Sequence, residues 1–277
     1  MRNVSEATVT EAVTEKFAGC DSPRLKQIIG ALVRHLHAFV REIEPNEAEW
    51  FAAIKFLTET GHMCDDKRQE FVLLSDVLGV STFVELINNR KEAGMTETSV
   101  LGPFFVEGAP ALPMGASIVQ DATPADLLVE GMVHDKDGKP VAGAVLDAWQ
   151  TAPNGKYDVQ DPSQPEMNLR GRFTTGADGT FSFRTCLPKE YPVPTDGPVG
   201  ALLRATGRHP WRPAHLHFMI EAPGFKKLIT ALYFEGDQYL DSDTVFGVKD
   251  SLVVAPAAHG DEGNSRISYS FGLERAA

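Results

Sequence analysis

The sequence predicts an α+β protein, mainly β, in which a helical N-terminal region precedes an antiparallel β-sandwich that carries the functional site. Apolar residues recur at helical spacing in the first third of the chain, whereas short apolar runs separated by turn signals fill the rest. A Gly- and Pro-rich connector over residues 100–113 separates the region with helical spacing from the region of short apolar runs. We therefore expect a helical domain over 1–99 and a β-sandwich domain over 100–277.

Length, composition and charge limit the classes of protein to which this chain can belong. The chain has 277 residues, of which 43% are hydrophobic, enough to bury a sizeable core. Its formal net charge of −12 argues against nucleic acid or an anionic membrane as a partner. No apolar run approaches the roughly 18 residues of a membrane span. The polar N-terminus predicts a cytoplasmic protein, and Cys20, Cys64 and Cys186 are typical of thiols in a reducing compartment.

Helices are predicted in the first third from their start signals. Ser22 supplies a capping hydroxyl and Pro23 suits the first helical position, and an apolar stripe follows over 25–40. Asn46, with Glu49 three residues later, predicts the next start. The predicted helices cover 23–44, 46–61, about 67–78, and the segment from Gly79 through Ile87. This is more apolar surface than short helices can hide, so part of it should pack on a partner.

Strands are predicted in the remainder. Asp137-Gly138 and Asp178-Gly179 are hairpin signals between apolar runs. The predicted strands cover 127–134, 141–150, 171–175, 180–184, 215–220, 228–234 and 251–255, a number that suits a sandwich. The loops over 151–169 and 187–211 exceed ordinary connections, and loops of that length on a rigid sheet usually carry function.

A histidine pair lies in the segment Arg212-Pro213-Ala214-His215-Leu216-His217. Side chains alternate across a strand, so His215 and His217 point to one face and Leu216 to the other. Such a pair is a natural half of a metal site, although two polar residues on a half-buried strand are the plainer alternative. His35 and His37 have the same spacing in a helical pattern, where residues two apart do not face each other, and are expected at the surface.

Two further features have a plain and a functional interpretation. Each long loop contains one tyrosine, Tyr157 and Tyr191, which taken alone are ordinary loop aromatics. With the histidine pair they would form a ligand set suited to ferric iron, because phenolate is a hard anionic donor, whereas a structural zinc site would use thiolates. Asp76 is a lone acid in the apolar run 71–79, and its periodicity favours an exposed helix face.

A resemblance to a known family is carried by the segment 212–217, together with Gly102-Pro103-Phe104, the segment 170–173 and Tyr191-Pro192. In these segments the chain resembles the intradiol ring-cleaving dioxygenases, the non-haem ferric family of catechol 1,2-dioxygenases. The similarity covers nearly the whole chain. Segments 73–79 and 99–105 are more similar to hydroxyquinol 1,2-dioxygenases than to catechol or chlorocatechol enzymes. The resemblance implies a dimerisation domain over 1–99 and a catalytic domain over 100–277. It also implies one Fe(III) per subunit, an aromatic diol or triol and O2 as substrates, a homodimer through the N-terminal helices, and a phospholipid at the dimer interface.

Residue by residue, the resemblance implies that Tyr157, Tyr191, His215 and His217 are the iron ligands. Tyr191 matches the tyrosine that leaves the iron when substrate binds, and Arg212 matches the arginine that stabilises charge on the substrate ring, so these two are the expected catalytic residues. The implied substrate-binding residues are Leu73, Asp76, Val100, Leu101, Gly102, Pro103, Phe104, Val193, Pro194, Arg212 and Val245. One departure is Ala231, where many catechol-cleaving relatives have a glutamine that assists the arginine.

The implied reaction is cleavage of hydroxyquinol, benzene-1,2,4-triol, with O2 to 3-hydroxy-cis,cis-muconate or its tautomer maleylacetate. The third hydroxyl would need an acceptor once it leaves water, and Asp76 could supply it through a charge-assisted hydrogen bond worth roughly 1.5–3 kcal/mol. Catechol or a substituted catechol is the alternative substrate. A metal-free, transthyretin-like binding module, with the helices serving only to dimerise, is the alternative of another class.

Overall fold

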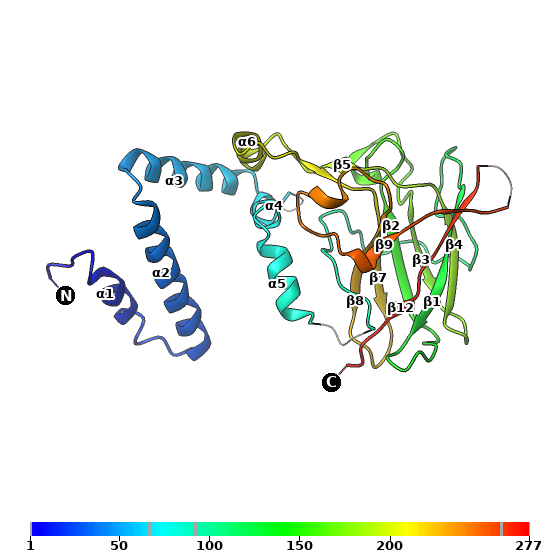
Figure 1. The fold of residues 1–277 in the computed structure, drawn as a ribbon, viewed down its shortest axis with the longest axis horizontal. Coiled ribbons are helices and arrows are strands. Elements are labelled where there is room, and N and C mark those ends of the chain that lie inside the picture. Colours follow the sequence, from blue (N-terminus) through cyan, green and yellow to red (C-terminus); the bar gives the residue numbers. More distant parts are fainter. Residues whose placement is uncertain (1, 66–67, 91–93, 261–262, 277) are drawn as a thin grey trace. The chain divides into compact units, whose positions relative to one another are not determined.

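The computed structural model describes residues 2–65, 68–90, 94–260 and 263–276. The chain forms two compact units, Met1–His62 and Met63–Ala277 (Figure 1). The sequence predicts a division between residues 99 and 100, whereas the structure groups the helices after His62 with the sheets. Among the described residues, no helix is both long and apolar enough to cross a membrane.

The first unit is helical. Its described part contains α1 (Val9–Glu15), α2 (Pro23–Ile43) and α3 (Glu47–His62). The Ser22 hydroxyl accepts a hydrogen bond from the Leu25 N–H over 3.3 Å, with proline at the first helical position, so the predicted start of α2 is confirmed. Asn46 Oδ1 accepts from the Glu49 N–H over 3.0 Å and Glu49 Oε2 accepts from the Asn46 N–H over 2.9 Å, which is the predicted cap of α3. The short α1 was not predicted.

The second unit begins with α4 (Glu70–Val77) and α5 (Val80–Asn88), and contains α6 (Pro198–Ala205) further on. Gly79 joins α4 to α5 with φ +72°, a left-handed conformation that glycine adopts without strain. The buried Glu70 carboxylate accepts a hydrogen bond from the Val199 N–H over 3.1 Å, which ties α4 to the start of α6. In α5, the Thr82 hydroxyl donates to the Val245 carbonyl oxygen over 2.8 Å, so both helices are tied to later parts of the second unit.

The sheets are built from short strands. They are β1 (Leu127–His134), β2 (Val145–Gln150), β3 (Arg170–Thr174), β4 (Thr180–Thr185), β5 (Tyr191–Pro192), β6 (Trp211–Arg212), β7 (His215–Glu221), β8 (Leu228–Phe234), β9 (Val253–Val254), β10 (Ala257–Ala258), β11 (Ser265–Ser268) and β12 (Phe271–Gly272). Short 3₁₀ turns cover Asp158–Gln160, Leu240–Ser242 and Asp250–Leu252. The predicted loop over 187–211 is therefore interrupted by β5, α6 and the start of β6.

Among the described residues, one sheet has the order β3-β2-β7-β8-β9 and a second the order β10-β11-β1-β12, with β4 paired to β1. Apolar residues such as Leu146, Phe183, Phe218 and Phe271 form the buried core. The predicted architecture, N-terminal helices followed by a β-sandwich, is confirmed, but the sheets are mixed and not antiparallel throughout, because β1 runs parallel to β11 and β12, and β8 parallel to β9. These pairings join segments that no local turn connects.

Candidate active site

The histidine pair lies on β7, at the centre of its sheet. His215 and His217 are both buried, and their Nε2 atoms lie 3.0 Å apart, while Leu216 points into the core on the other face. His215 Nδ1 lies 2.7 Å from the Pro213 carbonyl oxygen. Because a carbonyl only accepts, Nδ1 carries the proton and the Nε2 lone pair faces His217. The alternation predicted from the sequence is confirmed.

The two loop tyrosines meet this pair. Tyr157 and Tyr191 are both buried, with ring centroids 5.6 Å apart, and the Tyr191 ring lies 5.5 Å from that of His215. Backbone pairing between β5 and β6 sets Tyr191 opposite Arg212. Tyr157 Oη makes no hydrogen bond of normal geometry with any described residue, although it lies beside the Tyr191 hydroxyl. A buried hydroxyl without a partner in the described part of the chain, beside a tyrosine whose ring in turn lies next to His215, is typical of a ligand site.

Burial sets the protonation of this cluster. Burial and the nearby Arg212 charge lower the pKa of His215 to about 3, and burial together with His215 and Arg212 holds the pKa of His217 well below its usual value. Burial, together with the neighbouring Tyr191, holds the pKa of Tyr157 well above the usual value. At neutral pH both imidazoles are therefore neutral, the form that binds metal ions, and Tyr157 keeps its proton unless a cation replaces it.

The donor set favours one kind of metal. Among the described residues, no group of three or more His, Cys, Asp or Glu side chains is placed to hold a metal ion. A metal ion bound to the two imidazoles would thus need the oxygens of Tyr157 and Tyr191. Two phenolates and two neutral imidazoles form a hard, anionic set that suits a trivalent ion such as Fe(III).

Arg212 is the charged group of the site. It is buried, and its Nη1 lies 3.4 Å from Tyr191 Oη and 3.3 Å from His215 Nε2. Burial acts to lower the pKa of Arg212, but the negative charge of Asp243 holds it well above its usual value. The guanidinium therefore stays charged beside the tyrosine and histidine donors.

Aromatic and ionic neighbours support the donors, and the sequence did not reveal most of them. The Trp149 ring stacks on His217 with centroids 4.8 Å apart, and Phe104 stacks on Tyr157 at 4.6 Å. Arg170 lies 6.0 Å from the centre of the Tyr157 ring and pairs with buried Asp158 over 2.6 Å. Of these, only Phe104 and the segment containing Arg170 are marked by a recognisable sequence motif.

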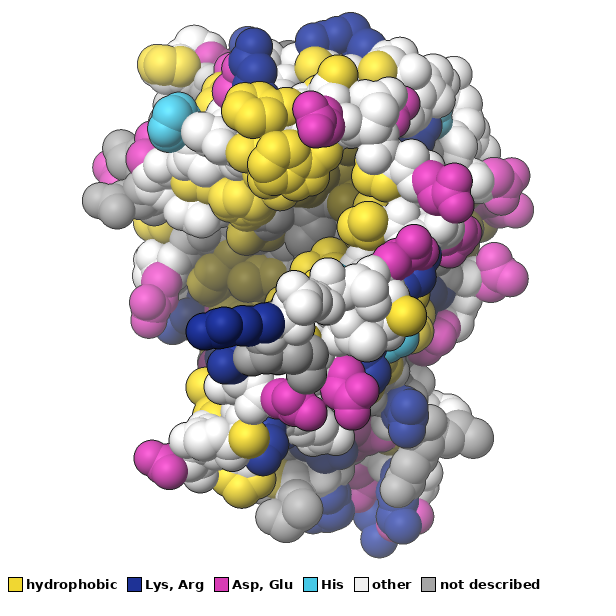
Figure 2. Space-filling model, turned by 90° about the vertical axis from the view of Figure 1, so that its left-hand side faces the viewer, with side chains coloured by type: hydrophobic (Ala, Val, Ile, Leu, Met, Phe, Trp, Pro, Cys, Tyr) yellow, Lys and Arg dark blue, Asp and Glu magenta, His cyan; other side chains and the backbone are white. Residues whose placement is uncertain are grey.

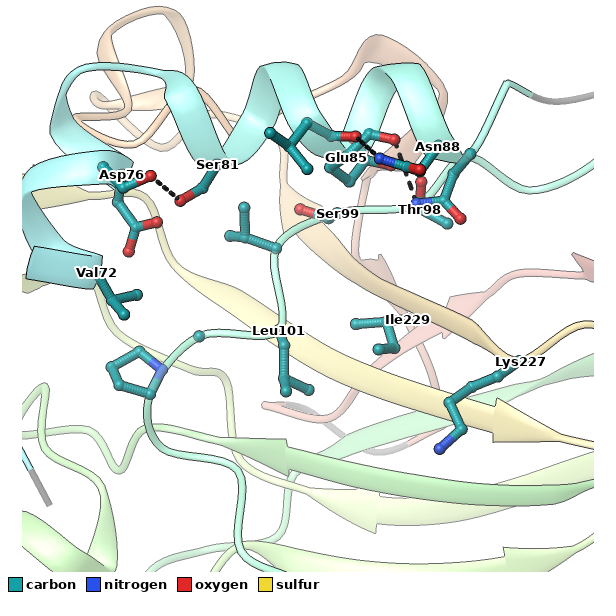
Figure 3. A pocket seen from close by; sticks show the side chains of 16 residues that line it. Val72, Asp76, Ser81, Glu85, Asn88, Thr98, Ser99, Leu101, Lys227 and Ile229 are labelled. Carbon is teal, nitrogen blue, oxygen red and sulfur yellow. Dashed lines mark hydrogen bonds between the residues drawn. The ribbon is translucent and has the colours of Figure 1, made fainter. Parts of the chain in front are cut away.

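A cavity of about 460 Å³ opens onto Tyr191 and Arg212. It is lined by Arg68, Gln69, Glu70, Val72, Leu73, Asp76, Val100, Gly102, Pro103, Phe104, Gln160, Tyr191, Val193, Pro194, Arg212 and Val245. Of the predicted substrate-binding residues, Leu101 is the exception. Its side chain lines an adjoining cavity of about 590 Å³ on the other side of the connector (Figure 3). A Cβ atom on Gly102 would lie 3.5 Å from His217 Nε2, so the connector backbone closely approaches the donors.

Asp76 lines both cavities. Its side chain is half-buried, in contrast to the exposed helix face that periodicity favours. Burial raises the pKa of Asp76, while hydrogen bonding with Ser81 and the Arg212 charge act in the opposite direction. Ser81 Oγ in turn lies 2.8 Å from Ser75 Oγ (Figure 3). The structure thus places a carboxylate with a disfavoured charge at the wall of the cavity that contains Arg212.

Known proteins match this chain over nearly its whole length. A family model described as "Dioxygenase" matches residues 100–275, and one described as "Catechol dioxygenase N terminus" matches residues 22–96. Hydroxyquinol 1,2-dioxygenase of Rhizobium sp. (strain MTP-10005) is 53% identical over 90% of this chain and 84% of its own. The 6-chlorohydroxyquinol 1,2-dioxygenase of Cupriavidus pinatubonensis is 50% identical over 99% of both chains.

A solved structure agrees with these sequences. Hydroxyquinol 1,2-dioxygenase from Pseudomonas putida DLL-E4 superposes with a TM-score of 0.92 at 51% identity, over 98% of this chain and 99% of that one. Matches of this extent, to enzymes throughout, favour an enzyme over a metal-free binding module. The sequence, the fold and the arrangement of two tyrosines, two histidines and an arginine agree, and the chain belongs to the intradiol ring-cleavage dioxygenase family.

Proposed function

We propose that the protein cleaves hydroxyquinol with O2 between its two adjacent hydroxylated carbons. Both oxygen atoms enter the product, 3-hydroxy-cis,cis-muconate, which tautomerises to maleylacetate. The observation that carries the choice of substrate is Asp76, whose carboxylate lines the same cavity as Tyr191 and Arg212. Relatives named for hydroxyquinol and 6-chlorohydroxyquinol, at 53% and 50% identity, support it.

We also propose one Fe(III) per subunit, held by Tyr157, Tyr191, His215 and His217. The neutral imidazoles and the unsatisfied Tyr157 hydroxyl support this set. When bound, ferric iron would draw electron density from the chelated substrate and so open the ring to attack by O2. Tyr191 Oη is the base placed to take a proton from a substrate hydroxyl, because it borders the substrate cavity directly.

The chain's other residues bind, orient and shield the substrate. The Arg212 guanidinium supplies fixed positive charge next to Tyr191, where negative charge would develop on the ring. The third hydroxyl would donate to the Asp76 carboxylate, and this contact sets the orientation of the ring. Apolar walls exclude water from the reacting carbons and are provided by Leu73, Val100, Phe104, Val193, Pro194 and Val245.

Oxygen uptake with hydroxyquinol and catechol, compared side by side on iron-loaded protein, tests the proposal. Hydroxyquinol should have the higher kcat/KM, because catechol leaves the Asp76 carboxylate desolvated and without a hydroxyl to accept. Equal efficiency with the two substrates would replace the hydroxyquinol assignment with the catechol alternative. No uptake with either substrate, in protein that contains iron, would overturn both.

The proposal extends to assembly. We propose a cytoplasmic homodimer that forms through the N-terminal helices, with a phospholipid bound at the interface. In the first unit, α2 exposes about half of Leu25 (49%), Leu32 (50%) and Phe39 (55%), and Figure 2 shows hydrophobic side chains gathered at the surface. Burying such a stripe against its two-fold mate would remove it from water. A monomer by light scattering at micromolar concentration would contradict the dimer.

A further inference from the structure

A closed ring of buried hydrogen bonds surrounds Arg212. Its Nε and Nη2 donate to the two carboxylate oxygens of Asp243 over 3.1 and 3.3 Å, and Nη2 also donates to Tyr233 Oη over 3.3 Å. Tyr233 Oη lies 3.0 Å from Ser99 Oγ, which donates to the Gly247 carbonyl oxygen over 3.1 Å. The Gly247 N–H donates to Asp243 Oδ2 over 2.9 Å, which returns to the starting carboxylate.

The direction of every proton in this ring is determined. A guanidinium only donates, whereas a carboxylate and a carbonyl only accept. Ser99 uses its proton on the Gly247 carbonyl, so Tyr233 must donate to Ser99 while it accepts from Arg212.

Glycine is required at position 247 by space. A Cβ atom there would lie 2.8 Å from Tyr233 Oη, 3.0 Å from Arg212 Nη2 and 3.1 Å from Asp243 Oδ2. These separations are shorter than ordinary van der Waals contacts, and the three neighbours are the polar atoms of the ring itself. Any larger residue would push Arg212, Tyr233 or Asp243 out of place.

The ring also reaches both walls of the substrate cavity. Ser99 directly precedes Val100, and Val245 lies between Asp243 and Gly247 and donates its N–H to Asp243 Oδ1 over 3.3 Å. Val100 and Val245 both line the cavity. Ser99 itself faces the adjoining cavity beside the connector (Figure 3). A change at any member is thus transmitted to the catalytic charge and to the shape of the cavity.

We propose that Ser99, Tyr233, Asp243 and Gly247 are positioning residues for Arg212. The ring keeps the Arg212 Nη1 atom directed at Tyr191 and His215. It also fixes the positions of Val100 and Val245, which line the substrate cavity, relative to the Arg212 guanidinium. The inference rests on the proposed function, in which Arg212 acts on the substrate. It also accounts for how the arginine is held in a chain with alanine at position 231, since Asp243 and Tyr233 accept its hydrogen bonds and Ser99 and Gly247 hold those two residues in turn.

The competing interpretation is that the ring only ties the connector and the 243–247 segment to the sheet. A tie of that kind would contribute to folding stability and nothing else. A positioning role predicts, in addition, a fall in kcat that exceeds any change in KM, and an altered environment of the Tyr191 oxygen, since Arg212 Nη1 contacts it.

Four variants of the full-length, iron-loaded protein separate these interpretations: Tyr233→Phe, Ser99→Ala, the double variant of the two, and Gly247→Ala. Tyr269→Phe is the matched control, because Tyr269 is half-buried and its hydroxyl donates to the Ser251 carbonyl over 3.1 Å, with no hydrogen bond to Arg212. For each, kcat and KM with hydroxyquinol, the melting temperature and the visible phenolate-to-iron absorption band are measured.

We expect Tyr233→Phe and Ser99→Ala to lower kcat by about tenfold to a hundredfold, as small misplacements of catalytic groups do, and to shift the visible band. The double variant should be little worse than either single variant, because the two substitutions break one connection. Gly247→Ala should be at least as severe, and Tyr269→Phe should retain the wild-type kcat and band.

The proposal is overturned if Tyr233→Phe and Ser99→Ala lower the melting temperature but keep the wild-type kcat, KM and band. Should Gly247→Ala fail to fold, the other two variants still decide the outcome. Wild-type protein that cleaves catechol but not hydroxyquinol would overturn the proposed substrate, and the ring is then judged on catechol turnover. If the wild type cleaves neither substrate, the visible absorption band decides. An unshifted band in Tyr233→Phe then overturns the positioning role of the ring, and a shifted band supports that role.

Discussion

His215 Nε2 lies 3.0 Å from His217 Nε2, and the other nitrogen of His215 is occupied by the Pro213 carbonyl. The His215 Nε2 lone pair is thus directed at His217, whose own Nε2 can approach it this closely only as a hydrogen-bond donor or through a shared cation. The low pKa values of the pair argue against an added proton at neutral pH. A metal ion that binds both Nε2 atoms would replace this contact, and His217 would then carry its proton on Nδ1, which has no hydrogen-bond partner among the described residues.

Loss of either imidazole should therefore abolish metal binding. His215→Ala and His217→Ala should purify with little iron, whereas Tyr191→Phe should retain iron but shift or weaken the red to burgundy colour expected of two phenolates on Fe(III). Metal analysis and visible spectra of each variant provide the measurement. His35→Ala, which removes a histidine of the first unit, is the control. Colourless wild-type protein after aerobic iron loading would rule out the ferric site.

Arg212→Lys tests whether charge alone is enough. Lysine keeps the positive charge but cannot donate to Asp243, Tyr233 and Tyr191 from one planar group. We expect kcat to fall by about tenfold to a thousandfold, as for loss of a preorganised donor, with a smaller change in KM. Steady-state oxygen uptake measures both constants. A variant with wild-type kcat would remove Arg212 from the catalytic residues.

Asp76→Ala tests substrate choice. A hydrogen bond to a charged acceptor is worth roughly 1.5–3 kcal/mol, so the preference for hydroxyquinol over catechol should shrink by about tenfold to a hundredfold. The loss should be mainly in kcat/KM for hydroxyquinol. Glu85→Gln is the control, since Glu85 lines the adjoining cavity and is absent from the wall of the substrate cavity. An unchanged ratio in Asp76→Ala would separate Asp76 from specificity.

The charged form of Asp76 should lower the free energy of unfolding, by an amount that depends on pH. Burial raises its pKa in the folded state, so the protonated form is the one the fold favours. Its contribution to stability is therefore present below the unfolded pKa and is lost as pH rises through the higher folded pKa. Asp76→Asn mimics the protonated form and should melt at a higher temperature than wild type near neutral pH.

The difference in melting temperature between Asp76→Asn and wild type should shrink as the pH falls toward about 4, where the aspartate itself takes up a proton. Thermal unfolding measured at several pH values gives this difference directly. A difference that is constant with pH would mean that the titration of Asp76 is not its source. A negative difference at neutral pH would mean that the carboxylate is stabilised in the fold.

Local rules predicted the local parts of this fold. Ser22 and Asn46 cap their helices as expected, because a cap depends on residues within one turn. The alternation of His215 and His217 also follows from strand geometry alone. The helix α6 was missed, although Gly197-Pro198 begins it, because its surroundings have the composition of a loop and its tie to Glu70 is long-range.

The supporting residues of the site could not be predicted for a related reason. Asp243 and Gly247 lie in an irregular segment, and Tyr233 lies in an apolar strand, so no period or spacing distinguishes them. Their significance appears only when the fold brings Ser99, more than a hundred residues away, into the same ring. The pairing of β1 with β11 likewise joins residues 127 and 265, and no local pattern encodes it.

The two halves of the proposed iron site differ in how firmly the backbone is held. His215 and His217 lie on β7, which is hydrogen-bonded to β2 on one side and β8 on the other. Tyr191 lies in a ribbon of two residue pairs, and Tyr157 precedes a single 3₁₀ turn. Amide hydrogens of β7 should therefore exchange with solvent far more slowly than those around the tyrosines. Any rearrangement during turnover would then involve the segments that contain Tyr157 and Tyr191. The two histidines would keep their positions while the aromatic ring of the substrate binds.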